Sequence, residues 1–409
     1  MKIIHTADWH IGGELYGHDR TADHISFFEQ LASLLSSEQP DALVVSGDIY
    51  DRVLPTHAAQ KLYIDTILML HSASPSTEIV IISGNHDSAS RLELTRPLWS
   101  HFNVHVIGFI ERDGEEVNRE KHFITIPNKG HIIALPFVYP HAYPPTEDKT
   151  DDRQRAYVTS LLDIVKERNS DGLPIVLMAH TAVAGSDFMG HKEHDISLDD
   201  EQRSIVGNIE VVTFEEFGTG YDYLALGHIH RPQEIRGSGG RAYYSGSPFA
   251  IGFDEIFPHS VNLVDVQHDQ EPLVKRIPIH PARRLVTLPD HPASLDEVIQ
   301  AIDSELDPDE EVFVRINLGV EGMVPVGAEA RIMEALKSRP HAIFCTIKYT
   351  NTMEAVDNQR DQIEMYESVR DNDPIEIALA YMSGKVNEEM KEEYKSMIES
   401  LWQEIIRAE

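Results

Sequence analysis

The chain has 409 residues, enough for two or three domains, and 41% of them are hydrophobic, as in globular rather than disordered proteins. A single cysteine, Cys345, excludes an intrachain disulfide and a thiolate metal cluster, so we expect a reducing, cytoplasmic setting. The formal net charge of −33 argues against a broad DNA-binding surface, which is usually basic, unless metal ions or a basic partner protein supply positive charge.

Apolar runs alternate with amphipathic stretches over the first two thirds of the chain. The first run is cut short by His5 and Asp8, so it predicts neither a signal peptide nor a membrane span. Buried strands are predicted at residues 2–6, 42–48, 78–85, 131–137, 175–181 and 223–230. Helices are predicted at residues 25–35, 59–71 and 156–167. This alternation predicts a layered α/β domain whose functional residues lie at the carboxyl ends of the strands.

The pattern changes after Ser245, and three domains are expected. Shorter strands at 260–267 and 273–281 read as a closing β layer, and the stretch HPARR marks a boundary. Beyond it, strand, helix, strand, helix and strand follow one another, which predicts a small α+β domain, and the last segment has helical spacing. The predicted domains are residues 1–280, 281–350 and 351–409.

Polar strings close these apolar runs and form the candidate site. They are DWH with Asp8 and His10, GDIYD with Asp48 and Asp51, GNHD with Asn85 and His86, AH with His180, and GHIH with His228 and His230. Any one of them alone is more often a turn, a surface pair or a hydrogen-bonded core histidine. Their joint occurrence at predicted strand ends favours a metal site. Carboxylate, imidazole and amide donors without thiolates suit Mn²⁺, Fe²⁺ or Zn²⁺.

Together these strings resemble the calcineurin-like metallophosphoesterases, which hold two metal ions at such positions. The longer stretches HTADWHIG, SGDIYDRVLP, SGNHDSASRL, YLALGHIHRPQ and YYSGSP are similar to the bacterial SbcD-type nuclease subunits, the DNA-repair branch of that superfamily. The resemblance is strong over the N-terminal domain and rests mainly on order and size beyond it. It implies an α/β fold of four layers, in which two mixed sheets are flanked by helices.

The resemblance also implies two divalent metal ions, with manganese favoured and magnesium, iron or zinc as alternatives. Both would act on a phosphodiester. The residues implied as ligands are Asp8, His10 and His230 for one ion, Asn85, His180 and His228 for the other, and Asp48 as the bridge.

Three further residues receive roles outside the ligand set. The resemblance makes His86 the catalytic histidine at the scissile phosphate, and Asp51 a catalytic partner that orients His86 and favours its charged form. Arg52 is expected either to contact phosphate or to be a surface arginine paired with a local acid. Aspartate at position 51 also occurs in the phosphatase branch, so this motif alone leaves both branches open.

The resemblance implies partners as well as a reaction. These are DNA, a second copy of the chain bound through the helix-like stretches after GDIYDRVLP and GNHDSA, and an SbcC-type coiled-coil ABC ATPase bound by the tail, giving a heterotetramer without a membrane. The small domain would control DNA access. The alternatives are a small-molecule phosphodiesterase, a protein phosphatase of the same superfamily, and a scaffold whose metal site has decayed. The presence of every ligand and of His86 weighs against decay.

Overall fold

The structure is a computed structural model that describes residues 1–114, 116–145, 152–187, 205–206, 209–320 and 324–351. The chain divides into two compact units. The first comprises Met1–Thr287, Pro308–Arg315 and Pro340–Thr346, and the second Leu288–Asp307, Ile316–Arg339 and Ile347–Glu409. The predicted helical tail lies outside the described residues, apart from Asn351, and the predicted domain limits stay a prediction.

Two six-stranded sheets form the centre of the first unit. The strands of one are β1 (Lys2–Thr6), β4 (Ala42–Ser46), β5 (Glu78–Ile82), β6 (Val104–Ile107), β17 (Ser260–Asp265) and β18 (Leu273–Pro278), in the order β18-β17-β1-β4-β5-β6. The strands of the other are β9 (Phe123–Ile126), β10 (Gly130–Ala134), β11 (Ile175–His180), β14 (Tyr223–Gly227), β15 (Gln233–Glu234) and β16 (Ala242–Tyr244), in the order β15-β16-β14-β11-β10-β9. Each sheet is mixed, because a parallel centre carries antiparallel strands.

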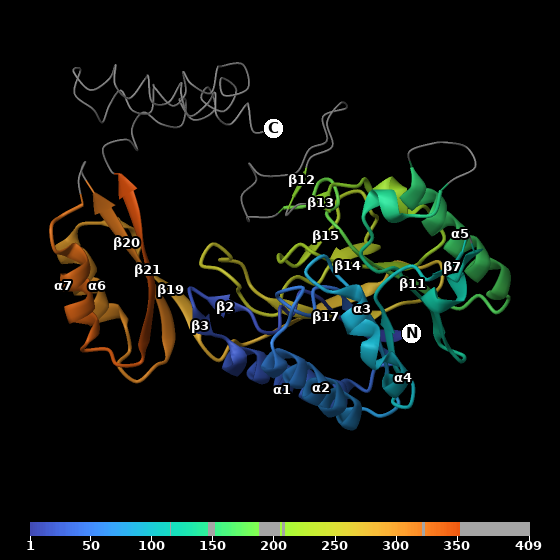
Figure 1. Ribbon diagram of the computed structural model, residues 1–409, viewed down its shortest axis with the longest axis horizontal. Helices are drawn as coiled ribbons and strands as arrows, with labels where there is room; N and C mark the ends of the chain where they lie inside the picture. Colours follow the sequence, from blue (N-terminus) through green and yellow to red (C-terminus); the bar gives the residue numbers. More distant parts are fainter. Residues whose placement is uncertain (115, 146–151, 188–204, 207–208, 321–323, 352–409) are drawn as a thin grey trace, which may run out of the picture. The chain divides into compact units, whose positions relative to one another are not determined.

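Helices cover the outer faces of both sheets, which confirms the expected four-layer α/β sandwich. Helices α1 (Thr21–Glu38) and α2 (His57–Ala73) lie side by side on one side of the sheets, and α5 (Arg153–Arg168) lies on the opposite side (Figure 1). Apolar side chains follow helical spacing on the buried faces, with Phe28 and Leu31 in α1 and Leu161 in α5. These residues pack against the sheet beside them.

A third apolar layer lies between the sheets. Val44 and Val80 of the first sheet and Val176 and Met178 of the second belong to one cluster of fully buried side chains. Because the central parallel strands are apolar on both faces, they read in the sequence as continuous hydrophobic runs, and all six predicted runs form strands. The two sheets are thereby held face to face.

Short elements complete the first unit. They are α3 (Ala89–Leu92), α4 (Arg96–Trp99), and the paired strands β2 (Glu14–Leu15) with β3 (His18–Asp19), β7 (Arg112–Asp113) with β8 (Glu116–Val117), and β12 (Ile205–Val206) with β13 (Ile209–Glu210). The helix-like stretch after GNHDSA is thus formed by α3 and α4 with a 3₁₀ turn, Glu93–Thr95, between them. Glu93 lies between them and accepts hydrogen bonds from the backbone N–H of Gly108 (2.6 Å) and from Lys121 (2.8 Å), which ties this stretch to neighbouring segments.

A three-stranded sheet with two helices follows, in the predicted order. It consists of β19 (Arg284–Ala293), α6 (Leu295–Glu305), β20 (Val312–Val320), α7 (Ala328–Leu336) and β21 (Ala342–Asn351), with β20 central. Ser294 and Glu297 form a capping box at the start of α6, and Arg331 of α7 pairs with Asp296 of α6 at 2.8 Å. Among the described helices, none has the length and apolarity needed to cross a membrane.

Candidate metal centre

The sequence-predicted ligands lie just beyond the carboxyl ends of parallel strands. Asp8 follows β1, Asp48 follows β4, Asn85 follows β5, His180 ends β11 and His228 follows β14. Strands of both sheets therefore carry predicted ligands at their ends. Because these strands are parallel, their carboxyl ends lie at one edge of the sandwich, and residues far apart in sequence meet there.

The first group contains Asp8, His10 and His230. One ligand atom from each lies within 4.8 Å of the others, and the Nε2 atoms of His10 and His230 are 3.3 Å apart. Asp8 also accepts the backbone N–H of His228 at 2.9 Å, so its carboxylate orders the GHIH loop. The three predicted ligands of one ion are therefore brought together.

The second group contains Asp48, His180 and His228, again with ligand atoms within 4.8 Å of one another. The Nε2 atom of His180 lies 3.4 Å from an Asp48 carboxylate oxygen and 3.0 Å from the Asn85 amide oxygen. The same Asp48 oxygen is 3.8 Å from Nε2 of His10, a member of the first group. Asp48 therefore stands between the two groups, where a bridging ligand is expected.

The donor atoms fit divalent cations. Oxygen and nitrogen ligands about 2.1 Å from an octahedral ion lie roughly 3 Å from one another, close to the separations seen here. Every donor is a carboxylate, an imidazole or an amide, the set that suits Mn²⁺, Fe²⁺ or Zn²⁺. Asp8, His10, Asp48 and His180 are buried, so unpaired negative charge there would be costly without a cation.

The backbone is strained at the same place. Asp8, His10, Asp48 and His228 have φ values of 53°, 48°, 49° and 103°, in a region that side-chain-bearing residues seldom adopt. A Cβ on Gly47 would lie 2.3 Å from the His180 ring, and one on Gly84 would lie 2.1 Å from the Asp48 carboxylate. The glycines of GD and GN therefore allow the close approach, and strain of this kind is typical of functional sites.

Carboxylates control the protonation of the buried histidines. Burial alone lowers the pKa of His180, but the negative charge and hydrogen bond of Asp48 outweigh it and raise the pKa to about 9. Glu255 does the same for His230, whose pKa also rises to about 9 despite burial. In the ion-free chain these protons hold the positive charge that a metal ion would bring, so metal binding and proton release are linked.

The two ligand aspartates differ in their ionisation. Burial raises the pKa of Asp8, although the charges of His180 and His230 oppose that shift. Burial also works against ionisation of Asp48, but the charge and hydrogen bond of His180 prevail and lower its pKa. Asp48 is thus the carboxylate held most firmly as an anion, as a shared ligand requires.

His86, Asp51 and Arg52 lie at the edge of the centre. The exposed His86 donates from Nδ1 to the backbone carbonyl of Asp51 at 2.8 Å, and its own N–H donates to Asp48 at 2.9 Å. The Asp51 carboxylate instead faces Nδ1 of His10, at 3.6 Å, and that histidine is the main cause of the lowered pKa of Asp51. Asp51 therefore contacts His86 through its carbonyl rather than through its carboxylate. Arg52 is 67% exposed and lies 3.4 Å from Asp51.

Two acids outside the predicted site residues support the centre. Asp87 is buried and accepts the backbone N–H groups of Ile49, Tyr50 and Gly84, so it fastens the GNHD loop to the GDIYD loop. Glu255 accepts Nδ1–H of His230 at 2.6 Å. Asp87 is visible in the GNHD string. Glu255 stands in a loop with no motif around it, so the sequence carried no signal for it.

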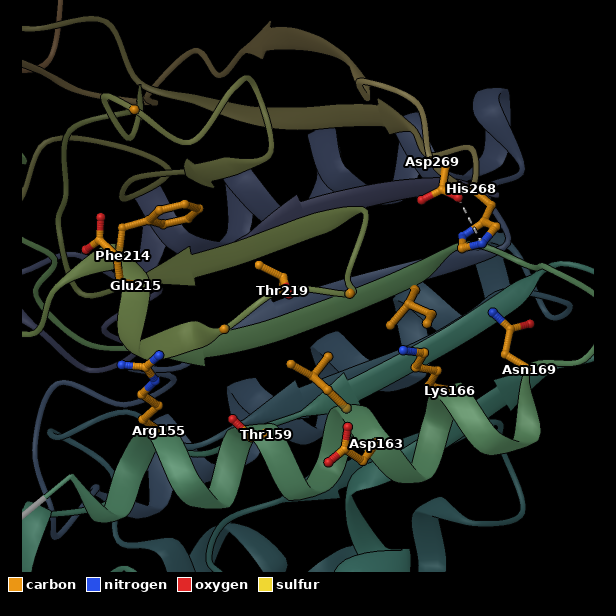
Figure 2. Close-up of a pocket in the computed structure, with 15 residues that line it drawn as sticks. Arg155, Thr159, Asp163, Lys166, Asn169, Phe214, Glu215, Thr219, His268 and Asp269 are labelled. Carbon is orange, nitrogen blue, oxygen red and sulfur yellow. Dashed lines mark ion pairs between the residues drawn. The ribbon is translucent and has the colours of Figure 1, made fainter. Parts of the chain in front are cut away.

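His10, Asp51 and His86 also form a group at the edge of the centre, whereas one further cluster and a cavity in the described part of the chain lie apart from the ligands. Asp222, His268 and Asp269 gather at a second place, where Asp222 already accepts backbone N–H groups from Ile175 and Asp269. A cavity of about 780 Å³ adjoins them, between α5 and the loop around Thr219 (Figure 2). None of the predicted site residues lines it.

Comparison with known proteins defines the class of this fold and site. The profile of the family described as Calcineurin-like phosphoesterase matches residues 1–232, more than half of the chain. The chain therefore belongs to the calcineurin-like phosphoesterase family.

Within that family the chain groups with the SbcD-type subunits. It is 34% identical to the SbcD subunit of the SbcCD nuclease of Rhodobacter capsulatus, over 76% of this chain and 77% of the relative. It is 30% identical to the SbcD subunit of Bacillus subtilis, over 70% and 71% of the two chains. The SbcD subunit of Escherichia coli is 28% identical over 62% of each chain.

Proposed function

We propose that this chain is a two-metal, manganese-dependent DNA phosphodiesterase. It would be the nuclease subunit of an ATP-dependent SbcCD-type complex, cutting double-strand ends and hairpins as an exonuclease and endonuclease in cytoplasmic DNA repair and recombination. The observation that carries this proposal is the meeting of two ligand groups around Asp48 at one edge of the sandwich. The names of its relatives supply the nuclease activity and the complex.

The proposed ligands keep their sequence-derived roles. Asp8, His10 and His230 would hold one ion, Asn85, His180 and His228 the other, and Asp48 both. When bound, the ions would lower the pKa of water and neutralise charge that develops on the phosphate oxygens. Asp87 and Glu255 keep the ligands in place, because each holds a loop or ring that carries them.

His86 is the residue of the chain best placed to handle a proton. Its Nδ1–H is fixed by the Asp51 carbonyl, which leaves Nε2 as the atom directed to substrate. It is exposed, whereas most of the ligands are buried, so a phosphodiester can reach it. We assign His86 the protonation or stabilisation of the leaving oxygen. Asp51 serves both rings, through its carbonyl on His86 and its carboxylate on His10.

Exposed apolar side chains support the proposed homodimer. Its side chains come from the loop after GDIYD and from α2, α3 and α4 or their junctions. They are Val53 (53% exposed), Leu54 (68%), Ile64 (36%), Leu68 (39%), Leu94 (79%) and Leu98 (64%). If these side chains form one continuous patch, it would be of the kind that is typical of protein–protein contacts. The tail for the coiled-coil ATPase lies outside the described residues, and its docking role is proposed from the sequence alone.

One assay separates this proposal from its alternatives. The purified chain is incubated with Mn²⁺ and either a DNA hairpin or a small phenyl phosphodiester. We expect cleavage of both, and none after chelation of the metal. Cleavage of the ester alone would favour a small-molecule phosphodiesterase or a protein phosphatase. Turnover of neither would favour a scaffold, and the SbcC-type partner should then be added before the nuclease is rejected.

A further inference from the structure

A line of aromatic side chains leads away from the candidate metal centre. The segment after β10 places Phe137 edge-on to His180, with ring centroids 6.4 Å apart at 85°. Tyr139 follows with its ring 4.9 Å from Phe137, and His141 lies nearly parallel to Tyr139 at 5.8 Å and 19°. We call Phe137, Tyr139 and His141 the aromatic track. It begins at a proposed ligand and ends in solvent.

The outer part of the track is available to a ligand. Tyr139 is 53% exposed and His141 is also exposed, whereas Phe137 is half-buried. A tyrosine and a histidine that only filled the core would be covered. Two exposed rings stacked on each other instead leave an outer π face open, which suits a flat, apolar surface.

A backbone hydrogen bond ties the aromatic track to the loop that carries Asn85 and His86. The backbone N–H of Phe137 donates to the carbonyl of Ser83 at 2.9 Å, just before the residues Asn85 and His86. A ligand on the track would therefore sit at a fixed distance from the proposed reaction centre. A DNA strand that runs from a stacking surface to the reacting phosphate needs such a fixed separation.

Positive charge lies at the far end of the track. The guanidinium of Arg153 donates to the carbonyl of His141 at 3.3 Å, and that of Arg112 donates to the carbonyl of Ala142 at 2.6 Å. Within the described residues, no ion pair with an acid engages either arginine. Rings beside arginines on an otherwise acidic chain form the combination that binds the bases and phosphates of a single strand.

We propose that Phe137, Tyr139 and His141 stack unpaired nucleobases of the DNA strand whose phosphate lies at the metal centre, with Arg112 and Arg153 on its phosphates. This rests on the proposed function and deepens it. Bases can stack on the track only when they are not paired, so the substrate at the centre is a frayed end, an overhang or a hairpin loop rather than intact duplex. Sequence preference should be weak, since every base has a π face.

Binding of a single strand tests the track separately from cleavage. Fluorescein-labelled polythymidine of twelve nucleotides is titrated with the full chain and Mn²⁺ in a His86→Ala background, and a denaturing gel checks that the DNA is intact. Tyr139→Ala should weaken binding roughly ten-fold, the effect of losing one stacked base. Tyr139→Phe should bind normally, because the ring and not the hydroxyl carries the contact.

A matched oligomer and a matched variant identify the contact. On an abasic oligomer of the same length, Tyr139→Ala should bind as its parent does, because no base is left to stack. Tyr349→Ala removes a tyrosine of similar exposure, 47%, and should leave polythymidine binding unchanged. Equal losses on both oligomers, or no loss on polythymidine, would overturn the track. Failure of the wild-type chain to cleave the hairpin even with the SbcC-type partner added would instead overturn the proposed function.

Discussion

Two sets of buried histidines behave in opposite ways within the same unit. His180 and His230 at the candidate metal centre have pKa values raised to about 9. His5, between the two sheets, has a pKa lowered to about 3, and His122, beside β9, has one lowered to about 4. His5, His122 and His180 are fully buried and the His230 side chain is 28% exposed, so burial does not account for the two directions of the pKa shifts. The charge of the group that faces each histidine separates the two sets.

The partners explain the contrast. His180 faces Asp48 and His230 faces Glu255, whereas Nδ1 of His5 lies 2.9 Å from the Tyr223 hydroxyl and Nδ1–H of His122 donates to the Ala134 carbonyl at 2.8 Å. Burial penalises the charged ring, and only a carboxylate reverses that penalty. The two histidines held by close carboxylates are therefore the ones at the candidate cation site, and His5 and His122, beside neutral groups, have structural roles.

The largest expected effect comes from removing the shared carboxylate. Asp48→Asn takes away the charge that raises the pKa of His180 and the ligand proposed for both ions. We expect loss of bound Mn²⁺ and of hairpin cleavage, measured by elemental analysis of dialysed protein and by gel assay. Asp222→Asn changes another buried aspartate beside a histidine and should keep the metal. Full metal content in Asp48→Asn would break the comparison.

The next effect concerns a histidine that belongs to neither set. His86 is exposed and has a backbone carbonyl as its Nδ1 partner, so its replacement should leave the metal ions bound. His86→Ala should slow cleavage about a hundred- to ten-thousandfold, the usual range for a general acid. Metal content and single-turnover rates measure the two properties separately. Wild-type cleavage by a fully loaded variant would remove His86 from the mechanism.

A smaller effect is expected at Glu255, which acts only through His230. Glu255→Gln keeps a hydrogen-bonding group of the same shape but removes the charge. Loss of such outer carboxylates typically weakens metal binding about ten- to a hundredfold. Calorimetric titration of the ion-free chain with Mn²⁺ measures this directly. Glu271→Gln changes an exposed glutamate and serves as control, and equal affinities in the two variants would limit Glu255 to a structural role.

Much of this arrangement could be predicted from the sequence because the buried strands have a recognisable pattern. The central parallel strands are buried on both faces, so each is an uninterrupted apolar run, and the polar string after it marks the carboxyl end. Asp8, Asp48, Asn85, His180 and His228 follow from that pattern alone. The four layers followed from the family resemblance, since hydrophobic runs do not reveal which strands share a sheet.

The rest depended on contacts that no local pattern encodes. Glu255 reaches His230 from a loop 25 residues further along the chain. The Asp51 carboxylate lies beside His10, whereas the Asp51 carbonyl accepts the hydrogen bond from His86. Backbone geometry decides which of these groups contacts His86, and residue type alone does not reveal it. The helix-like stretch after GNHDSA is helical over residues 89–99, but it consists of two short α-helices joined by a 3₁₀ turn, and Glu93 of that turn bonds to Gly108 and Lys121 across the fold. Long-range partners of this kind require coordinates.

The smallest expected effect concerns His5, one of the histidines with a lowered pKa, and is a change in the pH dependence of stability. Its pKa is about 3 in the folded chain and 6.5 in its ordinary state, so the unfolded chain takes up the proton first as the pH falls. The stability that the neutral, buried ring contributes is full above about pH 6.5 and is lost as the pH falls toward 3. Between pH 7 and pH 6 that loss is about 0.7 kcal/mol, from the ordinary pKa and 1.36 kcal/mol per unit.

Denaturant unfolding of wild type and His5→Gln at both pH values measures this loss, because the variant cannot take up the proton and should lose less stability by about that amount. His101→Gln, at an exposed histidine, should follow wild type. An unchanged pH dependence in His5→Gln would mean that burial without a carboxylate does not keep this ring neutral, and the distinction between the two sets of histidines would fail.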